Sequence, residues 1–276
     1  MGKASDLDSH KYHEEKISPY KAAIGSLLKQ EQDILSADDR KVESEAAFTA
    51  FSRLTLAENM LSLASNYLVL AGMSHSMLHQ RNEDALNEAR KSLYKAVIYL
   101  EEVVSPLLDA PYSDYEKKLN YINEVDAQTR YYLVRKTGLA IDLLKNAYGD
   151  NTKWKWSFVE LEGRYATVTK NILNPKTAVA NTDPGSPDYE PTLYHLALIK
   201  KLFLEAADRY RGKYELSTNH LDDFRKGIQF LTALRRIHIY LGERDEAEEV
   251  KKRADIWTAK LENDKKNREE AQSKRA

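Results

Sequence analysis

The sequence predicts an all-α protein, and three observations carry the prediction. The 276 residues include only 10 glycines and 7 prolines. The prolines are confined to Pro19 and the stretch between Pro106 and Pro191, so most of the chain lacks helix breakers. Apolar residues recur at steps of three and four, and no segment of useful length alternates with the period of a strand. We expect several unusually long antiparallel helices in an extended or bent arrangement.

The composition narrows the function classes. Net charge is −1, with 42 basic and 43 acidic residues intermixed, so the sequence lacks the clustered basic excess typical of nucleic-acid binding. The absence of cysteine excludes thiol catalysis, disulfides and cysteine-ligated metals. The longest apolar stretch, residues 67–73, is far too short to span a bilayer, so we expect a soluble protein without membrane insertion. Residues 1–16 lack the apolar centre of a signal peptide, which leaves open whether a leader has been removed.

In the N-terminal half, capping residues and prolines set the expected helix limits. The first helix should begin at Ser18-Pro19, a capping residue followed by proline. A second should run from Asp38 to about Gln80, and Asn82 should cap a third that stops before Pro106. Ser113 and Glu116 have the spacing of a capping box, which predicts one long helix over 114–148. Its inward-facing residues are expected to be Leu119, Ile122, Tyr132, Leu133, Leu139 and Leu143.

Beyond Gly149, an expected C-cap, the sequence predicts helices over about 153–173, 192–214, 221–241 and 244–265. Residues 174–191 are rich in Pro, Asn, Asp and Gly, and we interpret them as a linker rather than a binding loop. The expected organisation is therefore a flexible N-terminus (1–17), a long-helix lobe (18–173), the linker (174–191), a C-terminal helical lobe (192–266) and a frayed tail (267–276).

Small residues near the C-terminus have the spacing of a helical hairpin. Gly242 permits a tight turn, and Ala247 and Ala254, seven apart, let two helices approach closely. With Leu231 and Leu234 at apolar positions, this segment resembles a 34-residue tetratricopeptide unit. Three positions depart from that pattern: Arg235, His238 and Ala259. A weaker match contains Ala89 and Ala96, so the resemblance is to a degenerate array of hairpins, a type of protein that binds other proteins.

The candidate chemistry is sparse, and we expect no enzymatic activity, cofactor or metal. His75 and His79 lie four apart, but the glutamate that a zincin site places between them is missing. Trp154 and Trp156 follow an expected turn and are candidate interaction residues, because interfaces favour tryptophan; half-burial in the hairpin is an equal alternative. Trp257 lies inside an amphipathic segment and is assigned to the core.

The chain has 17 tyrosines, no cysteine, long helices and imperfect hairpin repeats. In these features it resembles the flagellar-coiling proteins that sheath the periplasmic filaments of spirochaetes. The resemblance implies a structural subunit of the filament sheath, located in the periplasm, that contributes to filament coiling and motility. Its partners would be flagellin or other sheath subunits, with possible self-assembly. The alternative is a soluble, cytoplasmic or periplasmic adaptor or chaperone-type protein that binds a peptide in a helical groove.

Overall fold

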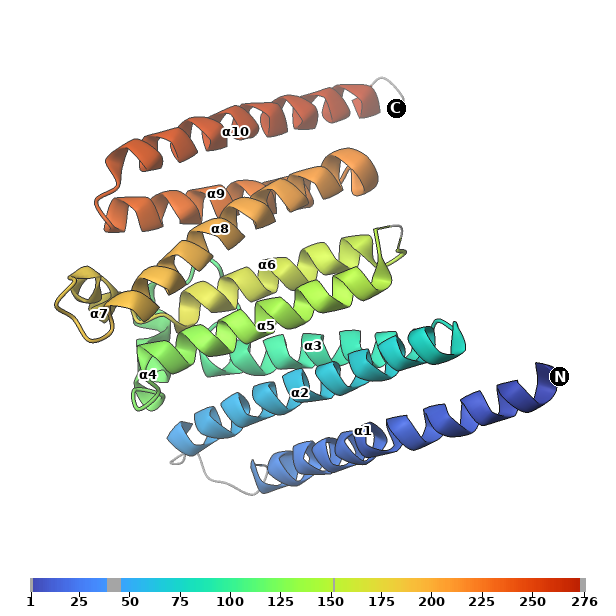
Figure 1. Ribbon diagram of the computed structural model, residues 1–276. Coiled ribbons are helices and arrows are strands. Elements are labelled where there is room, and N and C mark those ends of the chain that lie inside the picture. Colours follow the sequence, from blue (N-terminus) through green and yellow to red (C-terminus); the bar gives the residue numbers. More distant parts are fainter. Residues whose placement is uncertain (1, 39–45, 151, 274–276) are drawn as a thin grey trace. The chain divides into compact units, whose positions relative to one another are not determined.

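The computed structural model describes residues 2–38, 46–150 and 152–273, and within these ranges it is all-α, without strands, which confirms the predicted fold class (Figure 1). The chain divides into two compact units. Unit 1 comprises Met1–Pro106 and Ser113–Lys155, and unit 2 comprises Leu107–Tyr112 and Trp156–Ala276. The helices of unit 1 are α1 (Gly2–Asp38), α2 (Ala46–Leu78), α3 (Glu83–Val103), α4 (Tyr112–Tyr121) and α5 (Ala127–Tyr148).

In unit 1, α2 packs against α1 and α3, and α5 packs against both α2 and α3 (Figure 1). Asn82 begins α3 as predicted, because its side chain accepts a hydrogen bond from the amide of Ala85 at 3.0 Å. Ala89 and Ala96 of α3 are completely buried, as are Ala57 and Ala64 of α2. Small residues on packed faces allow helix axes to come close together.

The inward face of α1 has the heptad spacing of a coiled coil. Its buried and half-buried residues follow one another at alternating steps of four and three: His13, Ile17, Tyr20, Ile24, Leu27, Glu31, Ile34 and Asp38. This stripe explains why the predicted helix start at Ser18-Pro19 is wrong: residues 2–17, which the sequence analysis assigned to a flexible N-terminus, belong to α1. Pro19 lies inside α1, and the burial of His13 and Ile17 on its N-terminal side offsets the hydrogen bond that a proline removes.

Polar residues in this stripe fix the position of α1 along its neighbours. The buried carboxylate of Glu31 accepts hydrogen bonds from Lys95 Nζ at 2.9 Å and from Tyr99 Oη at 2.7 Å, both on α3. Asp38 pairs with Arg53 of α2 at 2.7 Å. A one-turn slip of α1 would leave Glu31 buried without these partners, which makes other registers costly. The predicted start of the second helix at Asp38 is also wrong, since Asp38 is the last residue of α1. Residues 39–45 of the predicted helix lie outside the described residues.

The single helix predicted over 114–148 is interrupted. α4 ends at Tyr121, and Asp126 caps α5 by accepting a hydrogen bond from the Thr129 amide at 2.6 Å. The guanidinium group of Arg130 donates to the carbonyls of Ile122 and Val125 at 2.7 and 2.9 Å, so the turn is stabilised from within α5. α4 starts at Tyr112, which places Ser113 inside the helix instead of at the predicted cap.

Unit 2 contains α6 (Lys155–Ile172), the short α7 (Pro175–Ala178), the 3₁₀ turn η2 (Ala180–Thr182), α8 (Tyr189–Lys213), a π-helical turn η3 (Tyr214–Thr218), α9 (Leu221–Tyr240) and α10 (Arg244–Ser273). Its core is aromatic: the ring of Phe230 lies 5.5 Å from that of Phe203 and 5.8 Å from that of Tyr210. α8 and α9 approach closely where α9 carries Gly227, since a Cβ there would lie 3.0 Å from the Ala207 carbonyl oxygen.

The structure places the division between units differently from the sequence prediction. The boundary falls at residues 155 and 156, while residues 174–191 lie within unit 2 and fold into α7, η2 and turns. Asn174 caps α7 at the Lys176 amide, and Asp183 accepts from the Gly185 amide at 2.8 Å. The Asn, Asp and Gly residues therefore form local turns instead of a linker. The expected frayed tail is helical through Ser273, and residues 274–276 lie outside the described part.

Candidate protein-interaction surfaces

The sequence-predicted hairpin corresponds to α9 and α10, which pack side by side (Figure 1). Gly242 lies in the turn between them with a φ of 77°, a left-handed conformation that glycine adopts without strain. Ala247 is buried, and Ala254 packs against the core of unit 2. Leu231 and Leu234 of α9 are also buried.

α10 packs through a second heptad stripe, composed of Ala247, Val250, Ala254, Trp257, Leu261, Asp264 and Arg268. Trp257 is the large buried residue of this stripe. Its ring lies 5.7 Å from the ring of Phe224 on α9, and the guanidinium groups of Arg211 and Arg253 lie over it at 5.1 and 4.8 Å. α10 therefore covers the face that α8 and α9 would otherwise present to a peptide.

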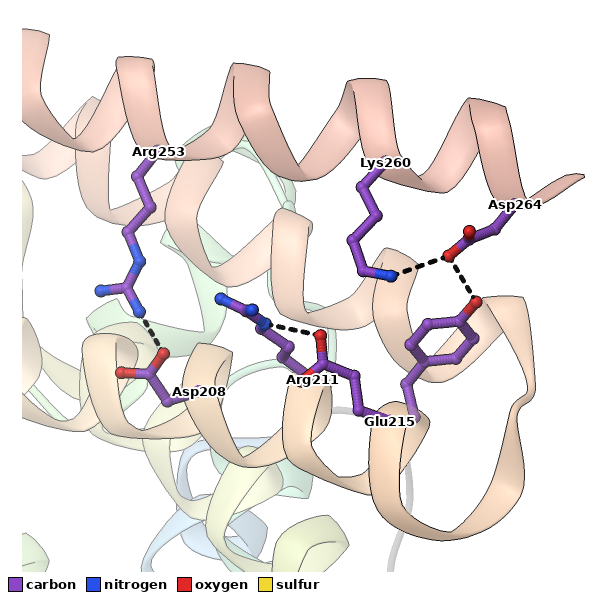
Figure 2. Close-up of polar contacts among 7 residues, drawn as sticks. Asp208, Arg211, Glu215, Arg253, Lys260 and Asp264 are labelled. Atoms are coloured by element: carbon purple, nitrogen blue, oxygen red, sulfur yellow. Dashed lines mark hydrogen bonds and ion pairs between the residues drawn. The ribbon is translucent and has the colours of Figure 1, made fainter.

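Ion pairs and hydrogen bonds surround this contact (Figure 2). Arg253 of α10 pairs with Asp208 of α8, while Arg211 pairs with Glu215 at 3.0 Å. At the far end, Asp264 accepts hydrogen bonds from the Tyr214 hydroxyl at 2.7 Å and from Lys260 Nζ at 3.1 Å.

The electrostatics of this network favour the ionised form of Asp264. The hydrogen bond from Tyr214 lowers the pKa of Asp264, and Lys260 lowers it further, which outweighs the opposing effect of burial. Since these side chains neutralise one another on α8, η3 and α10, we interpret the network of Figure 2 as the fastening of α10 and not as a reactive site.

The two candidate tryptophans are both half-buried. Trp154 lies beneath the guanidinium group of Arg90, 3.8 Å from its ring centroid, and the ammonium of Lys153 lies 5.2 Å from the same ring. Trp156 packs against the core of unit 2. Neither ring is among the exposed large apolar side chains of the described residues, so the most accessible apolar surface lies elsewhere.

The histidine pair does not keep the helical geometry that a metal site would need. His75 lies in α2, but His79 follows the end of that helix and has a φ of 53°. In the described ranges, no three His, Asp or Glu side chains are grouped to hold a metal ion.

The most exposed apolar stripe of unit 1 lies on α5. Tyr132, Leu139 and Leu143 are 52, 60 and 50% exposed, although the sequence prediction placed all three in the interior. The interior face of α5 is formed instead by Leu133, Val134, Ala140, Ile141 and Leu144. A signal for this surface exists in the sequence: apolar residues occupy two sides of the helix, more than one packed face can absorb.

Basic side chains flank the α5 stripe. Arg135 and Lys136 are exposed, and neither forms an ion pair with any described residue. Asp142 is the exposed acid nearby. The α5 surface, defined here as Tyr132, Arg135, Lys136, Leu139 and Leu143, thus combines three large apolar groups with two unpaired positive charges. This composition is typical of a protein contact and not of a catalytic site.

None of the helices in the described residues is both long and apolar enough to cross a bilayer.

No curated protein is significantly similar to this sequence. A chain from the solved structure described as "Computational Design of Self-Assembling Cyclic Protein Homooligomers" matches 90% of this chain and 97% of its own length at 12% identity. Its TM-score is 0.29, and a match at that level supports no conclusion. Residues 9–265 match the TP0443 family, a range that runs from within α1 to within α10. The chain therefore belongs to the TP0443 family.

Proposed function

We propose that this protein is a non-enzymatic structural subunit that binds other proteins, and that it serves in the sheath of the periplasmic flagellar filament, where it contributes to coiling and motility. The observation that carries the proposal is the α5 surface, where Tyr132, Leu139 and Leu143 are each at least half exposed. Large apolar side chains that gather on one exposed face of a helix are unfavourable in water, and on folded proteins such faces often mark contact sites.

The wider context supports the sheath role. The TP0443 family is of spirochaete type, and the chain's length, 17 tyrosines and lack of cysteine are the features by which it resembles flagellar-coiling proteins. A cysteine-free chain suits the periplasm, where thiols are oxidised. The partners we propose are flagellin or other sheath subunits.

The second candidate is a soluble adaptor or chaperone-type protein that holds a peptide in a helical groove. The α9–α10 hairpin, with Gly242 in its turn, favours this class of protein. The position of Trp257 counts against it, because α10 already covers the face formed by α8 and α9. A peptide would have to displace α10 from its aromatic contacts and ion pairs.

Fractionation of cells that produce the protein separates the two functions. After gentle lysis, filaments are sedimented and the protein is quantified in pellet and supernatant. A sheath subunit sediments with the filaments and is absent from the pellet of a strain without flagellin. An adaptor stays in the supernatant as a one-to-one complex, and that result would overturn the sheath proposal.

A further inference from the structure

The outer face of α5 carries a complete heptad seam. Tyr132, Lys136, Leu139, Leu143 and Asn146 follow one another at steps of four and three, and all five are exposed. From Tyr132 to Leu143 the seam extends about 16 Å along the helix. This spacing is the one with which α1 and α10 pack inside the molecule, but on α5 no described residue covers it.

α10 carries a matching seam on the side opposite Trp257. Its members, also at steps of four and three, are Asp245, Glu249, Lys252, Ile256 and Ala259, and all are exposed. Ile256, at 68%, is the most exposed large apolar residue of α10 in the described chain. Glu249 forms no ion pair among the described residues, and the neighbouring Glu248 is held only by an exposed contact of 3.6 Å with Lys251.

The two seams are complementary when the helices run parallel. Lys136 and Leu143 are seven residues apart, as are Glu249 and Ile256, so Leu143 meets Ile256 where Lys136 meets Glu249. In the same register Arg135 lies beside Glu248. The reverse orientation, with Leu143 still opposite Ile256, sets Lys136 against Asn263 and Arg135 against Asp264. That carboxylate already accepts hydrogen bonds from Tyr214 and Lys260. The parallel orientation sets one like pair, Asp142 and Asp255, side by side, but it gives both basic residues an exposed acid that no other helix holds. Charge therefore favours the parallel orientation.

We infer that the outer face of α5 binds the outer face of α10 of a second copy of this chain. The inference rests on the proposed function and names the partner of the α5 surface. The contact joins unlike faces, so each added copy leaves an open α5 and an open α10 at the ends. Such heterologous contacts generate rings or filaments rather than closed pairs. A single seam is a small contact, and repetition along a filament would strengthen it.

The experiment uses engineered cysteines, because the natural chain contains none. Purified Leu143→Cys protein is mixed with size-tagged Ile256→Cys protein and oxidised, and mixed disulfide dimers are quantified by non-reducing electrophoresis. The matched control pairs Ile256→Cys with Leu28→Cys, whose leucine is 42% exposed on α1. We expect the first mixture to give at least roughly tenfold more mixed dimer than the control, with a yield that falls as salt screens the charges.

Charge reversal tests the register. Arg135→Glu with Lys136→Glu in the Leu143→Cys chain should lower the yield about tenfold, and Glu248→Lys with Glu249→Lys in the Ile256→Cys chain should do the same. Combining the two reversed chains should restore the crosslink. A yield equal to the Leu28→Cys control, or no restoration, would overturn the inference. Sedimentation of the natural protein with filaments would in that case leave the sheath proposal standing, with a different protein on α5.

Discussion

The carboxylate of Glu243 lies 2.5 Å from Lys200 Nζ, which joins the turn between α9 and α10 to α8. The same carboxylate accepts a hydrogen bond from His238 Nδ1 at 2.6 Å. Burial alone would raise the pKa of Glu243, but the hydrogen bonds from Lys200 and His238 outweigh it and hold the pKa below its usual value. Glu243 directly follows Gly242. Gly242 therefore permits the turn, and Glu243 stabilises it by its bonds to Lys200 and His238.

Replacing Glu243 by Gln should lower the free energy of unfolding by about 1–2 kcal/mol, because the neutral amide loses the charge-assisted bonds to Lys200 and His238. The folded pKa is depressed, so this stabilisation is present above the ordinary pKa of 4.5 and is lost as pH falls through the folded value. Urea unfolding of the natural protein and of Glu243→Gln should show that the difference between their free energies of unfolding shrinks from about pH 6 to about pH 3. A difference that stays constant over this range would contradict the assignment.

Gly227 should not tolerate a side chain. A Cβ at this position would lie 3.0 Å from the Ala207 carbonyl oxygen and 3.4 Å from Trp257. We expect Gly227→Ala to destabilise by about 1–3 kcal/mol, despite the better helix propensity of alanine. The control is Gly212→Ala on α8, where a Cβ meets nothing within 4 Å and should be neutral or stabilising. Thermal unfolding of the two variants checks this; equal melting temperatures would mean that α8 and α9 are less closely packed than described.

Trp257 should hold α10 in place. Its replacement by Ala removes the contacts with Phe224, Arg211 and Arg253 and should cost about 3–5 kcal/mol. The neighbouring Ile256→Ala, at a position 68% exposed, should change stability by less than about 0.5 kcal/mol. Hydrogen exchange along 244–273 should accelerate strongly in the first variant and little in the second. Unchanged protection after Trp257→Ala would contradict the anchoring role.

Lys170 should make the stability of unit 2 depend on alkaline pH. Its ammonium donates to the Leu108 carbonyl at 3.1 Å, and burial lowers its pKa to about 8, although Asp109 acts in the opposite direction. Between about pH 8 and the ordinary value of 10.5, the unfolded chain keeps a proton that the folded chain has released, so stability rises with pH. The natural protein should therefore gain stability relative to Lys170→Met over this window. Lys201→Met, at a side chain 69% exposed, is the control, and the difference between its free energy of unfolding and that of the natural protein should not change with pH over this window.

The sequence predicted helices well where caps and breakers were local. Asn82 begins α3 at the expected residue, and Gly149 follows the end of α5. The interruption at Asp126 was missed, because an Asp inside an amphipathic pattern does not by itself predict a cap, and the hydrogen bonds from Arg130 that stabilise the preceding turn are not visible in the sequence. Pro19 misled the prediction for the opposite reason: tertiary packing of α1 overrode a local helix-breaking signal.

The α5 surface could not be predicted from the pattern of apolar residues alone. Leu139 and Leu143 have the same side chain as Leu133 and Leu144, yet the first two are exposed and the others are buried. Which apolar side of a helix is covered depends on how many neighbours surround it, and that number is a property of the tertiary structure. The close approach at Gly227 was likewise missed, because the need for a glycine there depends on the nearness of Ala207 and Trp257 in the folded structure.

The most direct measurement of the central claim compares variants of the α5 surface in filament-containing cells. Leu139→Asp with Leu143→Asp should fold normally, because both side chains are at least half exposed. The matched control is Leu28→Asp with Tyr12→Asp on α1, where the side chains are 42 and 54% exposed. If the protein is a structural subunit that docks through α5, the amount of the first variant in the filament fraction falls by about tenfold or more relative to the natural protein, while the amount of the control variant is unchanged. Equal amounts of both variants in the filament fraction, or natural protein absent from it, would contradict the account.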